Sequence, residues 1–251
     1  MNVLSIGNSF SEDAQRYLNK IARADSKNGV FTCNLMIGGC PLSTHYRNMK
    51  SEEEAYHLQV NGMMVCAKTS LKRALLSMNW DVITLQQVSR LSFDYESYQT
   101  YLNALVAYVK KYCPKAKIAI HETWGYLPES ETLHRMGYET HNEMYRDVAS
   151  CYEKAAKEIN ADLVLPSGYA MKTLLELGAP SIHRDSIHAN DLGRFTIALT
   201  WYQALTGRDI QGVDFSHLDF DVDLTAEEIA LAKKASYEAV KQYGYTIQPK
   251  Q

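Results

Sequence analysis

The chain has 251 residues, which is enough for one large α/β domain or two small ones. Its 46% apolar and 22% charged residues allow a well-buried core and exclude global disorder. The net charge of -3, without a lysine- or arginine-rich stripe, argues against a nucleic-acid partner. No apolar run approaches the roughly 20 residues that cross a bilayer, and the first strand begins too early for a secretory leader. We therefore expect a soluble protein without a membrane partner, cytoplasmic as written, or periplasmic or secreted if a leader was trimmed.

Cysteine usage gives little information on the compartment and leans towards a reducing one. The count is odd and no C-x-x-C occurs, so neither a disulfide framework nor a zinc knuckle is indicated. Free, buried thiols are expected at all five positions, Cys33, Cys40, Cys66, Cys113 and Cys151. The oligomeric state is left open.

Short apolar runs alternate with longer amphipathic segments. The expected strands cover residues 3–6, 31–37, 81–87, 116–122 and 161–166. The expected helices run from Ala14 to about residue 28 and over 70–78, 95–112, 136–159, 168–177 and 192–206. A last helix opens with Thr225-x-x-Glu228, a capping box. Residues 56–68 fit a hairpin insertion that turns at Asn61-Gly62.

This alternation predicts crossover connections and a parallel sheet. The expected fold class is α/β: a three-layer α/β/α sandwich around a central, mostly parallel five-stranded sheet. No linker, repeat or low-complexity tract divides the chain, so a single domain over residues 1–251 is expected.

The residues that follow the expected strands are small, polar or catalytic in type. In open α/β sheets, ligands bind beyond the carboxyl ends of the strands. The stretches at those ends are Gly7-Asn8-Ser9, Gly38-Gly39, Gln86-Gln87 and His121-Glu122-Thr123-Trp124, and the late loop "HRDSIHAND" precedes a helix. The sequence therefore predicts that the catalytic or ligand-binding site lies at this edge of the sheet.

Ser9 stands where the first strand meets the first helix. A serine there is a good helix N-cap, and it becomes a nucleophile only if a base takes its proton. The segment Asp185-Ser186-Ile187-His188 offers such a base. Its carboxylate can hold Nδ1–H of His188 and leave Nε2 facing outward. An ordinary acid and histidine in a surface loop is the alternative interpretation of so short a motif.

Five segments extend this pattern: "IGNSFS", "GGCPLSTHY", "WDVITLQQ", "HETWGY" and "DSIHAND-x-G". Together they resemble the SGNH, or GDSL-type, hydrolase superfamily and, more narrowly, its DUF4886 branch, over roughly residues 3–206. The resemblance implies the flavodoxin-like SGNH fold. It also implies Ser9 as nucleophile, His188 as general base and Asp185 as the group that orients it. Gly39, with Gly38 as the alternative, would donate its backbone N–H to the oxyanion.

The third block departs from the superfamily pattern. An asparagine in G-x-N-D usually completes the oxyanion hole, but this chain has "LQQVSR". A glutamine amide can donate the same hydrogen bond with one more methylene of reach. We expect Gln87, and less so Gln86, to join the N–H groups of Ser9 and Gly39. Loss of one such donor typically lowers kcat by about 10²–10³-fold.

Several further side chains are expected at the substrate pocket. Trp124 and Tyr126 could stack on a sugar or an acyl group, or simply pack the loop. Asn8 and His45 are expected at the same rim. No H-E-x-x-H motif or zinc spacing occurs, so no metal site is expected, and no cofactor is needed.

The leading hypothesis is a serine esterase that removes a small acyl group, acetyl by preference, from a carbohydrate or similar polyol through an acyl-enzyme. The acyl preference follows from the resemblance and from the nearby aromatic residues. The alternatives are a lipase or thioesterase of the same fold, and a catalytically weak or inactive glycan-binding protein. The G-x-S-x-G motif of α/β-hydrolases is absent, and a nucleotide-binding flavodoxin-like protein would need a glycine-rich phosphate loop. The expected partner is a small-molecule or glycan ester.

Overall fold

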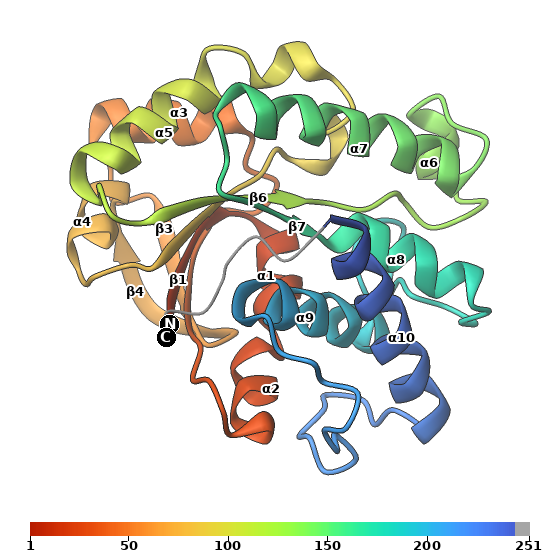
Figure 1. Ribbon diagram of the computed structural model, residues 1–251. Coiled ribbons are helices and arrows are strands. Elements are labelled where there is room, and N and C mark those ends of the chain that lie inside the picture. Colours follow the sequence, from red (N-terminus) through yellow and green to blue (C-terminus); the bar gives the residue numbers. More distant parts are fainter. Residues whose placement is uncertain (244–251) are drawn as a thin grey trace.

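A seven-stranded sheet lies between two layers of helices in the computed structural model, which describes residues 1–243 (Figure 1). The strand order is β4-β3-β2-β1-β5-β6-β7. The strands are β1 (Asn2–Gly7), β2 (Phe31–Met36), β3 (Tyr56–Val60), β4 (Met63–Thr69), β5 (Val82–Leu85), β6 (Lys117–Glu122) and β7 (Leu163–Pro166). The expected three-layer α/β/α fold is confirmed.

Helices cover both faces of the sheet (Figure 1). The lower layer in that view contains α1 (Ser9–Gln15), α2 (Leu18–Asp25), α8 (Ser167–Glu176), α9 (Asp191–Thr206) and α10 (Ala226–Tyr243). The upper layer contains α3 (Leu42–Ser51), α4 (Leu71–Leu76), α5 (Tyr101–Tyr112), α6 (Glu131–Arg135) and α7 (His141–Glu158). Two short 3₁₀ turns, η1 (Ser89–Leu91) and η2 (Tyr95–Tyr98), follow β5.

Both faces of the central strand are buried. Val3 packs in the core under α1 and α9, whereas its neighbour Leu4 packs in the core under α5 and α7, and both are fully inaccessible to solvent. A parallel strand covered on both sides has no solvent face, which explains the continuous apolar run. α9 is buried almost all round and is correspondingly apolar along its length.

The hairpin at residues 56–69 belongs to the main sheet. β1, β2, β5, β6 and β7 pair in parallel, as expected, while β3 and β4 add two antiparallel strands beyond β2. Asn61 and Gly62 turn the hairpin with φ angles of 49° and 77°. A Cβ at position 62 would lie 2.8 Å from the backbone oxygen of Arg16, so the turn needs glycine. The sheet therefore has seven strands, not five.

The helix boundaries differ from expectation where local capping decides them. The first helix starts at Ser9, before the expected Ala14, and breaks into α1 and α2. The segment expected as one helix over 95–112 is interrupted at Thr100, whose φ is 66°. α7 begins at residue 141 because Thr140 and Glu143 form a capping box. The expected capping box of Thr225 with Glu228 is present at the start of α10.

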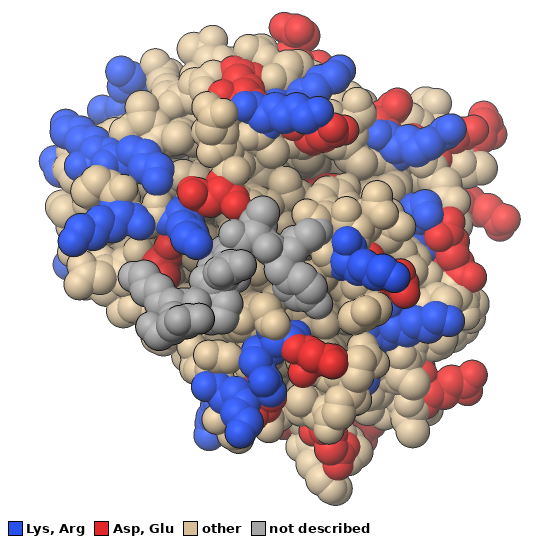
Figure 2. Space-filling view, in the orientation of Figure 1, with Lys and Arg blue, Asp and Glu red and all other residues tan. Residues whose placement is uncertain are grey.

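Two polar segments form helices that the apolar periodicity does not indicate. Residues 42–51 form α3, and residues 131–135 form α6. Among the helices of residues 1–243, none combines the length and apolar character that a membrane span requires. Positive and negative side chains are both spread over the face shown in Figure 2.

Four cysteines, at positions 33, 40, 113 and 151, carry free thiols. All but the half-buried Cys113 are buried. The side chain of Cys66 lies outside the described part of the chain.

The chain order reverses at β1. From β1 the chain moves to β2 on one side and later returns to β5 on the other. Loops leaving such neighbouring strands diverge to opposite sides and open a crevice at their carboxyl ends. Ser9 stands two residues after the end of β1 and therefore lies at this switch point.

Candidate active site

Ser9 is the first residue of α1, and its neighbour Asn8 caps the helix. Asn8 Oδ1 accepts a hydrogen bond of 3.0 Å from the backbone N–H of Phe10. The alternative in which Ser9 serves as the N-cap is therefore wrong, because another side chain fills that position. The Ser9 hydroxyl is free for a different partner.

That partner is His188, 179 residues away in the sequence. Ser9 Oγ lies 2.9 Å from His188 Nε2, and His188 Nδ1 lies 2.8 Å from Asp185 Oδ2. The side chains of His188 and Asp185 are 22% and 49% exposed, so the row of three groups is open to solvent at both the imidazole and the carboxylate. The structure thus brings together the three residues that the sequence singled out, in the order hydroxyl, imidazole, carboxylate.

The Asp185 carboxylate also shapes its own loop. Its Oδ1 accepts 2.8 Å hydrogen bonds from the backbone N–H groups of Ile187 and His188. Partial burial raises the pKa of Asp185, but these hydrogen bonds and the imidazole outweigh burial and lower it to about 2. Asp185 is therefore ionised at neutral pH and can stabilise an imidazolium at His188.

The loop that carries the candidate base is fastened to the loop after β6. The backbone N–H of Leu127 donates to Ser186 O at 2.9 Å, and Trp124 Nε1 donates to Ile187 O at 3.0 Å. The indole is fully buried and stacks on the ring of Phe10, with 4.1 Å between ring centroids. Trp124 therefore positions the histidine loop, which corrects the expectation that it contacts substrate.

A buried carboxylate on α1 holds the same loop from the other side. Asp13, four residues after Ser9, is fully buried. Its Oδ1 lies 2.7 Å from Arg184 Nη1 and 2.8 Å from Arg194 Nε, and its Oδ2 accepts the backbone N–H of Ala189 at 3.1 Å. The helix that begins with Ser9 and the residue after His188 are thus joined directly. Sequence reasoning missed this contact, although an acid among the buried positions of a short helix is a signal that could have indicated it.

The two glutamines after β5 do not face the candidate oxyanion site. Gln87 is fully buried, and its Nε2 donates to both the backbone oxygen and the hydroxyl of Ser97, each at 3.0 Å. Its Oε1 accepts the backbone N–H groups of Leu42 and Val88. Both amide hydrogens are already donated, which corrects the expectation that Gln87 completes the oxyanion hole.

Gln86 instead fixes the orientation of Asn8. Its Nε2 donates to Asn8 Oδ1 at 2.7 Å, while its Oε1 contacts the hydroxyl of Ser11 at 2.6 Å and Nδ1 of His121 at 2.5 Å. Asn8 Nδ2 then donates to Cys40 O at 3.2 Å. Asn8 and Gln86 are both buried, so they support the turn before Ser9 from inside the protein and do not line a pocket.

The loop after β2 carries the two glycines that are expected at the oxyanion site. Gly38 and Gly39 are exposed, and Gly39 has a φ of 61°, which favours glycine. Their backbone N–H groups donate to no other residue within the described chain, 1–243. The hydrogen bond from Asn8 to Cys40 ties this loop to the turn that carries Ser9.

Two other expected pocket residues are buried. Tyr126 is 2% exposed and donates its hydroxyl hydrogen bond to Ser89 Oγ at 3.0 Å. His45 is fully buried and stacks on Tyr56, with its Nδ1 3.1 Å from the tyrosine hydroxyl. Burial lowers the pKa of His45 to about 3, so its ring is neutral. Both expectations are corrected by this burial.

The sequence matches the family model described as "Domain of unknown function (DUF4886)" over residues 2–239. The chain belongs to the DUF4886 family. A solved DUF4886 family protein from Bacteroides uniformis ATCC 8492 is 28% identical, with a TM-score of 0.86 over 99% of this chain and 97% of that one. No curated protein matches the sequence.

More distant structures share the fold of this DUF4886 chain. A putative GDSL-like lipase from Parabacteroides merdae ATCC 43184 is 17% identical, with a TM-score of 0.54 over 82% of this chain and 95% of that one. A member of the lipolytic protein G-D-S-L family from Veillonella parvula DSM 2008 is 16% identical, with a TM-score of 0.50 over 82% and 96%. The expected resemblance to the SGNH, or GDSL-type, fold is confirmed.

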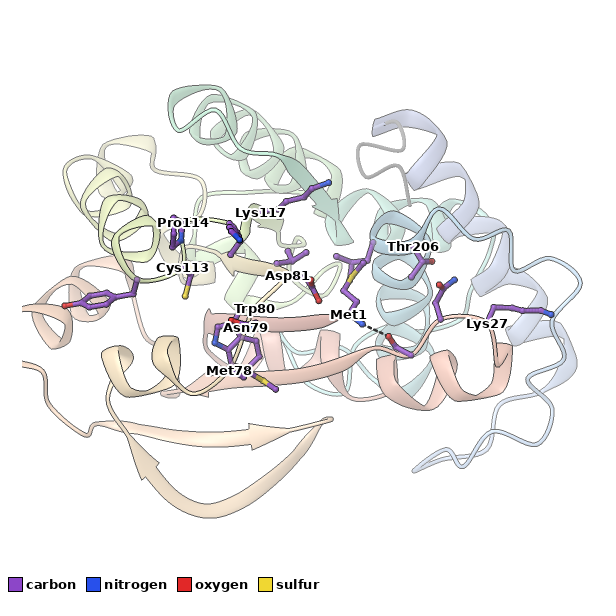
Figure 3. Close-up of a pocket in the computed structure, with 17 residues that line it drawn as sticks. Met1, Lys27, Met78, Asn79, Trp80, Asp81, Cys113, Pro114, Lys117 and Thr206 are labelled. Atoms are coloured by element: carbon purple, nitrogen blue, oxygen red, sulfur yellow. Dashed lines mark hydrogen bonds between the residues drawn. The ribbon is translucent and has the colours of Figure 1, made fainter. Parts of the chain in front are cut away.

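A cavity of about 850 Å³ lies elsewhere, at the amino ends of the strands (Figure 3). Met1, Asp81 and Lys117, which stand at or next to the starts of β1, β5 and β6, are among its lining residues. Ser9 follows the opposite end of β1, so this cavity is separate from the candidate active site. Among the described side chains of residues 1–243, which leave out Cys66, no group of three or more histidine, cysteine, aspartate or glutamate residues is placed to hold a metal ion.

Proposed function

We propose that this DUF4886 protein is a serine ester hydrolase that works through Ser9, His188 and Asp185. One observation carries the proposal: Ser9 Oγ is 2.9 Å from His188 Nε2, whose Nδ1 is 2.8 Å from Asp185 Oδ2. A serine hydroxyl beside an imidazole that a carboxylate orients is the arrangement that activates serine as a nucleophile.

In the first half-reaction, Ser9 Oγ attacks the ester carbonyl carbon while its proton passes to His188 Nε2. The bond between that carbon and the alcohol oxygen then breaks, and His188 returns the proton to the leaving oxygen. This leaves an acyl group on Ser9 and releases the alcohol. Water then attacks the acyl-enzyme with His188 as base, which yields the carboxylic acid and restores Ser9.

The negative charge that develops on the carbonyl oxygen needs hydrogen-bond donors. We assign this role to the backbone N–H groups of Ser9 and Gly39. Support comes from the exposure of Gly39 and from the hydrogen bond of Asn8 to Cys40, which ties its loop to the turn that carries Ser9. Backbone donors that are fixed before reaction require no reorganisation as charge develops.

The acyl group in this proposal is small, with acetyl preferred, and the alcohol is a carbohydrate or similar polyol. This part rests on the resemblance to the SGNH superfamily, because the buried Trp124 and Tyr126 no longer support contacts to a sugar. A chain-length series of p-nitrophenyl esters tests it. A small-acyl esterase prefers acetate, whereas a preference for octanoate would indicate a lipase.

Turnover with p-nitrophenyl acetate tests the reaction itself. We expect hydrolysis by the wild type and its loss in Ser9→Ala. Ser216→Ala is the matched control, because Ser216 is exposed and lies in the loop before α10. Equal rates in the wild type and Ser9→Ala would remove Ser9 from the mechanism. Absence of turnover in a folded wild type that still binds acetylated glycans would favour the glycan-binding alternative.

A further inference from the structure

An arginine lies against the glycine loop of the proposed oxyanion site. Arg90 Nη1 donates a hydrogen bond of 3.1 Å to Gly39 O, and it would lie 3.5 Å from a Cβ built on Gly39. Arg90 belongs to η1, five residues beyond the end of β5. Its guanidinium therefore connects the loop after β5 to the loop after β2, and β1 lies between these two strands in the sheet.

The charge of Arg90 also lowers the pKa values of two side chains, Cys40 and Tyr126, that follow different strands of the sheet. Burial raises the pKa of the Cys40 thiol to about 12, and the charges of Arg47 and Arg90 oppose that shift. Burial likewise raises the pKa of Tyr126, and Arg90 again opposes it. Cys40 follows β2 and Tyr126 follows β6, so the guanidinium lies near the exits of strands on either side of β1 and β5.

Arg90 has hydrogen-bond donors that no other described residue engages. A guanidinium carries five N–H donors, and within residues 1–243 only its bond to Gly39 engages one of them. The side chain is exposed, and no carboxylate of the described chain forms an ion pair with it. The carboxylate of the candidate triad, Asp185, is already engaged by His188 and two backbone N–H groups.

We propose that Arg90 selects acetyl esters whose alcohol part carries a carboxylate. The inference rests on the proposed esterase function and names the class of ester that the same site prefers. A planar guanidinium matches a carboxylate with two parallel hydrogen bonds. Because one bond to Gly39 already orients the side chain, less conformational freedom is lost when a substrate binds.

The test compares two activated acetyl esters that differ in charge. The anionic substrate is p-acetoxybenzoate, and the neutral one is p-acetoxybenzamide, which has nearly the same shape. The quantity measured is the ratio of kcat/KM for the anionic ester to that for the neutral ester, corrected for spontaneous hydrolysis. The ratio cancels any general effect of a substitution on Ser9 or Gly39.

We expect the wild type to prefer the anionic ester by about tenfold, and Arg90→Met to bring the ratio to about one, a change of about 1.4 kcal/mol. Arg90→Lys should keep part of the preference, because it retains the charge but not the planar fork. Added salt should reduce the wild-type ratio, because the site is open to solvent. Arg23→Met is the matched control, since Arg23 is an exposed arginine at the far end of α2, and it should leave the ratio unchanged.

The test distinguishes failure of the proposed role of Arg90 from failure of the proposed esterase function. If p-nitrophenyl acetate is hydrolysed through Ser9 but the wild-type ratio is one, or if Arg90→Met keeps the wild-type ratio, the role of Arg90 is overturned while the esterase function stands. If the folded wild type cleaves none of the three esters, the esterase function fails and this inference fails with it.

Discussion

Asp13 Oδ2 accepts a hydrogen bond of 3.1 Å from the backbone N–H of Ala189, so the helix that begins with Ser9 is joined to the residue next to His188. The same carboxylate lies between Arg184 and Arg194. The distance from Ser9 to His188 thus depends on the ion cluster around the buried Asp13 as well as on the sheet.

Asp13→Asn should disturb this connection. The substitution leaves Arg184 and Arg194, whose side chains are 35% and 16% exposed, without their buried carboxylate, so we expect the free energy of unfolding to fall by about 1–3 kcal/mol. Below the unfolding temperature, kcat for p-nitrophenyl acetate should fall more than KM rises, because the change affects the alignment of Ser9 with His188. Urea unfolding and steady-state kinetics measure the two effects.

Asp219→Asn is the control for Asp13. Asp219 pairs with Lys20 of α2, and its side chain is 91% exposed. An exposed ion pair contributes about 0.2–1 kcal/mol, so this variant should keep nearly wild-type stability and kcat. Equal kcat values for Asp13→Asn and the wild type would show that the cluster does not align the site.

Asn8→Asp restores the acid that the first block of the superfamily usually carries, yet we expect it to be harmful here. Asn8 Nδ2 donates to Cys40 O, and an aspartate would place an oxygen against that acceptor. The loss of this buried hydrogen bond should cost about 1–3 kcal/mol and lower kcat. Thermal unfolding and ester hydrolysis measure the change. A variant as stable and active as the wild type would mean that the amide orientation is unimportant.

Gln87→Leu should lower stability and have little effect on the chemistry. The substitution leaves the backbone N–H groups of Leu42 and Val88 without their buried acceptor, at a cost of about 1–3 kcal/mol. In the folded protein, kcat should stay within about tenfold of wild type, well short of the roughly 10²–10³ loss typical of an oxyanion donor. A loss of that larger size at unchanged stability would restore the oxyanion role expected from the sequence.

Glu122 should make stability depend on pH. Full burial raises the pKa of Glu122 to about 7, although hydrogen bonds from Tyr243, Tyr169 and Tyr145 lower it. Between an ordinary glutamate pKa of about 4.5 and pH 7, the unfolded chain loses a proton that the folded chain keeps. The contribution of Glu122 to the free energy of unfolding is therefore greatest below about pH 4.5. It falls by about 3 kcal/mol as the pH rises to 7.

Glu122→Gln should remove this dependence, because a glutamine does not titrate. Chemical unfolding at pH 5 and pH 7 gives the slope, with the exposed Glu227→Gln as the control that should keep the wild-type slope. An unchanged slope in Glu122→Gln would show that the buried carboxyl is not the group responsible.

The sequence predicted the parts of the site that depend on local pattern. A buried strand that runs into Gly7-Asn8-Ser9 and a D-x-x-H loop before a late helix each carry their own signal, and the fold class requires that strand exits converge. The capping box at Thr225 was predictable for the same reason, because its partners are three residues apart.

Contacts between distant side chains could not be predicted in this way. Gln87 follows a strand at the right place, but its amide is used by Ser97 and Leu42 in the upper layer. The contact of Asp13 with Arg184 spans 171 residues, so no local spacing indicates it. The aromatic residues of "HETWGY" were assigned to a pocket on type alone, and their burial depended on packing that only the folded chain reveals.

The central claim is that Ser9 becomes acylated with the help of His188. The most direct measurement is reaction with a fluorophosphonate probe, followed by mass spectrometry of the peptide that contains Ser9, for the wild type and His188→Ala. We expect one adduct, on Ser9, in the wild type, and far slower labelling in His188→Ala. An adduct on another residue, or equal labelling rates in the two proteins, would contradict the account.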